Sequence, residues 1–214
     1  MRSKLAGART FTEEARRQQI VSCAVELIAE SGYPQASIAK IAERADIAKS
    51  VVLYHFHSKD ELVAAIVETV FAASAAVMVP RIAATSSATE RLTAYIDANG
   101  EFLDTHRREA IALYEVSTSY RGGDGRRFDQ AVQASVDASG VPPEFALLDP
   151  LTILSDGIRD GEFRTATDPH LLKNILRAAL DGAVGELSRD DTYDVLAHTA
   201  AVKDLFLAAI GAHQ

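Results

Sequence analysis

Residues 37–61 read SIAKIAERADIAKSVVLYHFHSKDE and contain two short segments with helical spacing of their apolar residues, 37–44 and 49–56. Helices this short are not stable alone in water, so they must pack on each other and on a neighbouring helix. Asp46 lies in the link between them, and Asp tolerates the left-handed backbone that a sharp turn needs better than most residues do. The stretch therefore predicts a helix, a tight turn and a second helix, the geometry that places a helix in the DNA major groove.

The second helix and the residues around it offer candidate DNA contacts. Lys49 and Ser50 begin this helix, where side chains reach base edges, and Val51 is suited to a thymine methyl group. DNA phosphates accept hydrogen bonds from hydroxyl, imidazole and ammonium groups and from the backbone N–H groups at the start of a helix. The predicted DNA-binding set is Ser37, Lys49, Ser50, Val51, Tyr54, His55 and Lys59, with a basic arm formed by Arg2, Lys4 and Arg9.

The rest of the chain also reads as helix, and the fold class predicted is all-α. A first helix is expected over 12–31, with Thr12 as its N-cap and Gly32 after its end. A capping box from Ser58 to Glu61 begins a helix that Pro80 is expected to end near residue 79. Further helices are expected over 88–106, 108–120, 126–138, 145–160, 169–187 and 192–212.

Charge is distributed unevenly along the chain. Of a net charge of −8, residues 1–60 contribute +2 and residues 61–214 contribute −10. This asymmetry favours a nucleic-acid-binding end on a body with another role. No apolar run of about eighteen residues lacks a charge, and the N-terminus lacks the apolar stretch of a secretory signal, so we expect a cytoplasmic protein that uses no membrane.

Residues 12–62 resemble the N-terminal domain of TetR-type (tetracycline-repressor-like) regulators. The resemblance rests on Gly32, Ser37, Ile41-Ala42, Ala45, Ile47, Tyr54-His55-Phe56, Lys59 and Leu62, with no gap in the spacing. The chain departs from the family pattern at four positions. Asp46 and Ser50 replace glycines, Ala48 replaces the serine that would cap the second helix, and Leu53 replaces a tyrosine.

The resemblance implies two functional regions, a homodimer and a small-molecule effector. We expect residues 1–60 to form the helix-turn-helix DNA-binding domain and residues 61–214 to form a helical ligand-binding and dimerisation domain. Two amphipathic helices, about 168–188 and 192–212, are the expected dimer interface. Aromatic and polar residues on neighbouring helices form the predicted effector site: Phe71, Tyr95, Asn99, Phe102, Tyr114 and Thr118.

The function predicted is a sequence-specific transcriptional regulator, a repressor that a small-molecule effector releases from its double-stranded DNA operator. One alternative is a helical dimeric sensor that has lost DNA binding, which the changes at Ala48, Ser50 and Leu53 keep open. A second is an all-helical enzyme, which would need an acid–base or metal cluster in 61–214. The sequence shows no such cluster, so we expect no enzyme activity, no metal site and no cofactor.

Overall fold

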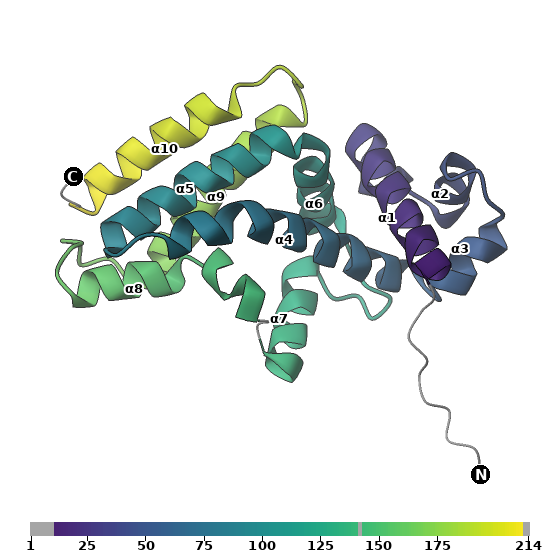
Figure 1. Ribbon diagram of the computed structural model, residues 1–214, viewed down its shortest axis with the longest axis horizontal. Coiled ribbons are helices and arrows are strands. Elements are labelled where there is room, and N and C mark those ends of the chain that lie inside the picture. The colour runs from purple at the N-terminus through teal and green to yellow at the C-terminus, as the bar shows by residue number, and fades with distance from the viewer. Residues whose placement is uncertain (1–10, 141–142, 212–214) are drawn as a thin grey trace, which may run out of the picture.

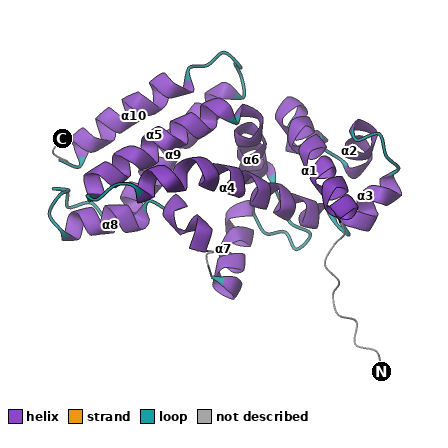
Figure 2. Ribbon diagram, viewed as in Figure 1, coloured by secondary structure: helices purple, strands orange, loops and turns teal. Residues whose placement is uncertain are grey.

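The computed structural model describes residues 11–140 and 143–211, and within these ranges the chain is built from ten α-helices and two 3₁₀ helices. The expected all-α fold is thereby confirmed, and Figure 2 shows helices joined by loops throughout the described part. The basic arm of Arg2, Lys4 and Arg9 and the last residue of the expected 192–212 helix, Ala212, lie outside the described residues.

Three helices form a unit at one end of the molecule (Figure 1). They are α1 (Phe11–Ser31), α2 (Ile38–Arg44) and α3 (Lys49–His55), with the 3₁₀ helix η1 (Tyr33–Gln35) after α1. Thr12 lies inside α1, so the expected N-cap at this residue is wrong. Gly32 follows α1 with a φ of 81° and a ψ of 154°, so glycine is needed there although the backbone is not in the expected left-handed helical region.

Helix α4 (Lys59–Ala83) runs from this unit across the rest of the molecule (Figure 1). The expected end near residue 79 is wrong, because α4 contains Pro80 and continues for three residues. Pro80 is exposed, while Met78 and Ile82 on either side of it are buried in a hydrophobic cluster that holds the last turn in place. By length and composition alone α4 is also apolar enough to cross a membrane, a property that core helices share.

The remaining helices form the larger body of the molecule, through which α4 runs (Figure 1). They are α5 (Ala88–Thr105), α6 (Arg107–Ser119), α7 (Phe128–Ser139), η2 (Pro143–Leu148), α8 (Leu151–Arg159), α9 (Pro169–Leu187) and α10 (Val195–Ala209). The expected single helix over 145–160 is wrong, because Pro150 separates η2 from α8. The last helix begins three residues later than expected, because the Asp194 side chain accepts a hydrogen bond from the Ala197 amide at 2.9 Å and caps it there.

Two hydrophobic clusters hold these helices together, and α4 contributes to both. The first includes Ile41, Val52 and Phe56 of the N-terminal unit together with Val116 of α6 and Leu187 of α9. The second lies between α4, α5, α8, α9 and α10. The first cluster therefore extends across residue 60, and the N-terminal helices share their core with the body of the protein.

Candidate DNA-binding and effector sites

The position of α3 is fixed by buried apolar residues and by one arginine of α1. Val52 and Phe56 are fully buried against the other two helices. The Arg17 guanidinium lies 3.9 Å from the centre of the Phe56 ring, and its Nη1 donates to the His55 carbonyl oxygen at 2.6 Å. The C-terminal end of α3 is thus attached to α1, which leaves the opposite side of the helix facing solvent.

The tight turn before α3 has the expected backbone. Asp46 has a φ of 51°, the only positive value at a non-glycine residue in the described ranges. Ser37 caps α2, since its hydroxyl accepts a hydrogen bond from the Lys40 amide at 3.3 Å. Ala48 at the start of α3 supplies no such bond. Helix, turn and helix therefore form as predicted, but α3 lacks a side-chain cap.

Most of the predicted DNA-binding residues share the exposed side of this unit. Ser37, Lys49 and Ser50 are exposed, and Val51 is half-buried. The Tyr54 side chain is 68% exposed, and its hydroxyl donates to a carboxylate oxygen of Glu13 at 3.3 Å.

His55 and Lys59 differ from the others in having neighbours within the fold. The half-buried His55 ring packs edge-on against Tyr54 with its centroid 5.2 Å away. Lys59 lies 4.1 Å from the centre of the Tyr33 ring, and its Nζ donates to the Tyr33 carbonyl oxygen at 3.5 Å. Lys59 is half-buried, and this loss of solvation lowers the pKa of its ammonium group.

Helix α6 is linked to the N-terminal unit by carboxylates. Glu30 of α1 pairs with Arg44 of α2 and, at 2.9 Å, with Arg108 of α6. Hydrogen bonds from these two guanidinium groups lower the pKa of Glu30 to about 2. A carboxylate oxygen of Glu115 on α6 accepts a hydrogen bond from the Tyr33 amide at 3.4 Å. Helix α6 therefore contacts α1 through Arg108 and η1 through Glu115.

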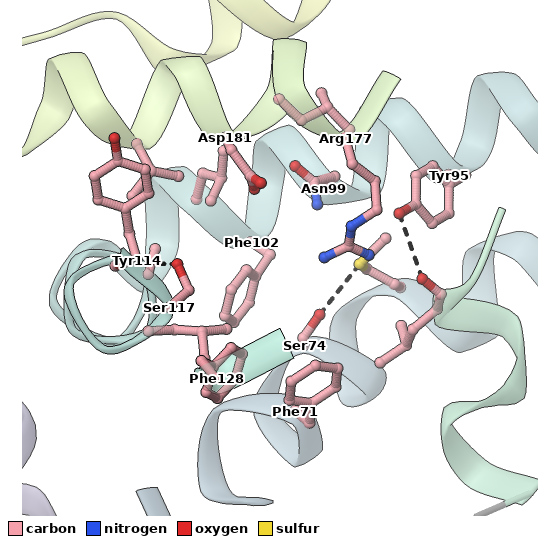
Figure 3. Close-up of a pocket in the computed structure, with 17 residues that line it drawn as sticks. Phe71, Ser74, Tyr95, Asn99, Phe102, Tyr114, Ser117, Phe128, Arg177 and Asp181 are labelled. Atoms are coloured by element: carbon pink, nitrogen blue, oxygen red, sulfur yellow. Dashed lines mark hydrogen bonds between the residues drawn. The ribbon is translucent and has the colours of Figure 1, made fainter. Parts of the chain in front are cut away.

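The other side of α6 borders a cavity of about 140 Å³. Its lining comes from α4, α5, α6, α7, η2 and α9, and Figure 3 shows how the side chains surround it. Five of the six predicted effector residues line it: Phe71, Tyr95, Asn99, Phe102 and Tyr114. Thr118 does not. It is exposed, and its hydroxyl donates to the Tyr114 carbonyl oxygen at 3.0 Å, whereas Ser117, one position earlier on α6, lines the cavity.

The cavity has an aromatic side and a polar side (Figure 3). Phe71, Phe102 and Phe128 form the aromatic side. On the polar side, the side-chain oxygen of Asn99 is buried without a hydrogen-bond partner. A buried amide oxygen without a partner costs free energy.

Sequence reasoning missed two charged residues on the polar side, Arg177 and Asp181 of α9. Both residues expose much of their surface, but Figure 3 shows the Arg177 guanidinium and the Asp181 carboxylate directed into the cavity. Loss of solvation raises the pKa of Asp181, and the charge of Arg177 partly opposes this rise. The spacing of four residues, which places the two side chains on one face of a helix, was the available signal.

Comparisons with known proteins agree with this arrangement. A model of the family described as bacterial regulatory proteins, tetR family, matches residues 20–66. The fatty acid metabolism regulator protein of Bacillus subtilis (strain 168) is 24% identical over 197 residues, which is 90% of this chain and 94% of that protein. The HTH-type transcriptional regulator BetI of Burkholderia mallei (strain NCTC 10229) is 36% identical over 87 residues, 40% of this chain and 45% of that protein.

Solved structures resemble the chain over nearly its whole length. FadR from Bacillus subtilis, in complex with stearoyl-CoA, has a TM-score of 0.67 and 25% identity, and the match covers 90% of this chain and 98% of that one. FadR from Bacillus halodurans has a TM-score of 0.68 and 24% identity, with coverage of 89% and 97%. The likeness therefore includes the helices around the cavity as well as the N-terminal unit.

Proposed function

Because the chain belongs to the tetR family of bacterial regulatory proteins, which are DNA-binding transcriptional regulators and not enzymes, we propose that it is a repressor released from its operator by a small molecule. Residues 1–60 bind DNA in this proposal, and residues 61–214 bind the effector and form the dimer. The proposal rests on the position of α6. One side of this helix borders the cavity, and the other side forms a hydrogen bond and an ion pair with the N-terminal unit.

The DNA-binding surface proposed is the exposed side of α2 and α3, with Ser37, Lys49, Ser50, Val51, Tyr54, His55 and Lys59 as its contacts. Lys49 and Ser50 are fully available for base edges or phosphates. The seven residues contribute unequally. The Tyr54 hydroxyl donates a hydrogen bond to Glu13, and Lys59 is packed on Tyr33, so we expect Lys49 to contribute most to affinity.

The dimer interface proposed is formed by α9 and α10. Ile175 of α9 is 50% exposed and Leu205 of α10 is 73% exposed, and both are large apolar side chains. Leu171, Ala178 and Gly182 extend the exposed stripe along α9, and the small residues among them allow close approach of a second helix pair. We expect Ile175→Glu or Leu205→Glu to give monomers in sedimentation, whereas Val132→Glu, a change at an exposed apolar residue of α7, should leave dimers.

The effector proposed is a compact molecule with an apolar end and a polar end. The three phenylalanine rings suit the apolar end, and Asn99, Arg177 and Asp181 suit a polar end that both donates and accepts hydrogen bonds. A cavity of about 140 Å³ is comparable to one that holds benzene. A ligand as long as the stearoyl-CoA bound to the Bacillus subtilis relative would require the cavity to open.

Release would follow from a shift between two conformations. The DNA-bound dimer holds its two α3 helices about one DNA turn apart, roughly 34–36 Å. An effector that favours another position of α6 would change this separation, and DNA would weaken effector binding by the same factor.

Fluorescence anisotropy tests this proposal, with DNA flanking the protein's own gene and a scrambled duplex at two salt concentrations. Selective, salt-sensitive binding that Lys49→Ala weakens is expected. The labelled complex is then titrated with stearoyl-CoA, a short-chain acyl-CoA and benzoate, with wild type and Asn99→Leu compared. If no duplex selected from random DNA binds selectively, the protein is a sensor without an operator, and the proposal fails.

A further inference from the structure

Helix α3 presents a mixed polar and apolar strip to solvent. Lys49, Ser50 and Leu53 are exposed, while Val52 and Phe56 are buried, so the rotation of the helix about its axis is fixed. Residues four apart lie on one face of a helix, which places Leu53 one turn beyond Lys49. The surface proposed to meet DNA therefore contains a large aliphatic side chain beside a lysine.

Packing within the protein core does not explain why a leucine occupies position 53. Its side chain is 41% exposed, and it is absent from both hydrophobic clusters, whereas Val52 immediately before it and Phe56 after it belong to the first cluster. Leucine cannot donate a hydrogen bond to a phosphate, and the tyrosine usual at this position in related regulators could. The change from tyrosine thus removes a polar contact and leaves an apolar one.

We propose that Leu53 reads a thymine, by packing on the thymine C5-methyl group in the major groove. The methyl group is the apolar feature of the base edges in that groove and distinguishes thymine from the other bases. Lys49 on the same face suits the O6 and N7 acceptors of guanine. Four residues of helix span about 6 Å, so the thymine and the guanine should lie within about two base-pair steps. This inference rests on the proposed DNA binding.

The test removes the methyl group from the DNA and the leucine from the protein. A duplex is first selected from a random pool by the wild-type protein. Each thymine of that duplex is then replaced, one at a time, by deoxyuridine, which lacks only the methyl group. Wild type and Leu53→Ala are measured on every duplex by anisotropy, and circular dichroism melting checks that the variant is folded. Val132→Ala, which truncates an exposed apolar side chain on α7, is the matched control.

We expect one deoxyuridine position in each half-site to weaken wild-type binding about four-fold. This factor corresponds to the loss of one buried methyl group, which contributes about 0.8 kcal/mol. Leu53→Ala should bind the thymine and deoxyuridine duplexes equally at that position, and Val132→Ala should behave as wild type does.

Three results would overturn the inference. If the wild type binds selectively but no deoxyuridine position matters, Leu53 reads no thymine, although the regulator proposal stands. If the deoxyuridine effect persists in Leu53→Ala, a different residue such as Val51 contacts the methyl group. If no duplex is bound selectively, the proposed function fails together with this inference.

Discussion

Glu162 should stabilise the start of a helix that lies far from it in the sequence. Its two carboxylate oxygens accept hydrogen bonds from the amides of Ala88 at 2.9 Å and Thr89 at 2.8 Å, and one of them also accepts the Thr89 hydroxyl at 2.9 Å. Both amides belong to the first turn of α5, where helix N–H groups have no partner within the helix. An anion at this end also interacts favourably with the helix dipole.

The substitution Glu162→Gln keeps the size of the side chain and removes its charge. A glutamine side chain has one acceptor oxygen in place of the two that bind Ala88 and Thr89, so its NH₂ group would face one of these two amide donors. A hydrogen bond to a charged group contributes about 1.5–3 kcal/mol, and Glu162 is only half-buried, so we expect a total loss of about 2 kcal/mol. For a chain of this size that corresponds to a fall in melting temperature of about 4–8 °C.

Thermal unfolding followed by circular dichroism measures this loss, at one protein concentration because a dimer's stability depends on it. The matched control is Asp160→Asn, which makes the same charge change two residues away. The Asp160 carboxylate contacts only the exposed Arg159 among the ion pairs of the described residues, and such pairs contribute about 0–1 kcal/mol. If Glu162→Gln melts within about 1 °C of Asp160→Asn, the carboxylate does not cap α5 and the reasoning is wrong.

The same contact predicts a dependence on pH. The amides of Ala88 and Thr89 lower the pKa of Glu162 from its ordinary value of 4.5. A group whose pKa is lower in the folded state stabilises the fold fully above its unfolded pKa and loses this contribution as the pH falls through its folded pKa. The difference in melting temperature between wild type and Glu162→Gln should therefore be constant near neutral pH and shrink below pH 4.5. A difference that stays unchanged at pH 3 would contradict this account.

Three further predictions concern single residues. Asn99→Leu should raise the free energy of unfolding by about 1–3 kcal/mol in chemical denaturation, because it removes a buried oxygen without a partner. The same substitution should weaken the response to effector, measured as release of DNA. Ala48→Ser should raise the free energy of unfolding by about 1 kcal/mol, because the serine side chain would cap α3, and an unchanged denaturation midpoint would contradict this. Gly157→Ala should lower the free energy of unfolding by about 1–3 kcal/mol, because the new methyl group would overlap the Phe163 ring. Adding Phe163→Leu to this variant should recover part of the lost stability.

Local patterns in the sequence were sufficient for the DNA-binding unit. The Ser37 cap and the left-handed backbone at Asp46 each depend on residues within a few positions of one another. Helix α4 continues past Pro80, because the burial of Met78 and Ile82 outweighs the hydrogen bond lost at the proline. Propensity is a weak guide wherever packing between distant segments decides.

The cavity could be predicted only in part. Asn99 stood out because an amide in an apolar helix face needs a partner, and the aromatic residues followed from helical spacing. Arg177 and Asp181 could not be assigned to the cavity from the sequence, because charged residues on a helix usually face solvent and the pattern of α9 favours an interface helix. Glu162 could not be linked to α5 either, since its partners lie more than seventy residues earlier in the chain.

The core shared across residue 60 limits how this regulator can be recombined with others. A chimera that joins these first sixty residues to a different effector domain would place the face of α1 that packs on α6 against a foreign surface. It would also lose the carboxylate of Glu115 that the Tyr33 amide requires. A sensor engineer would have to transplant the contacting face of α6 with the DNA-binding helices, and so would carry one wall of the original cavity into the hybrid.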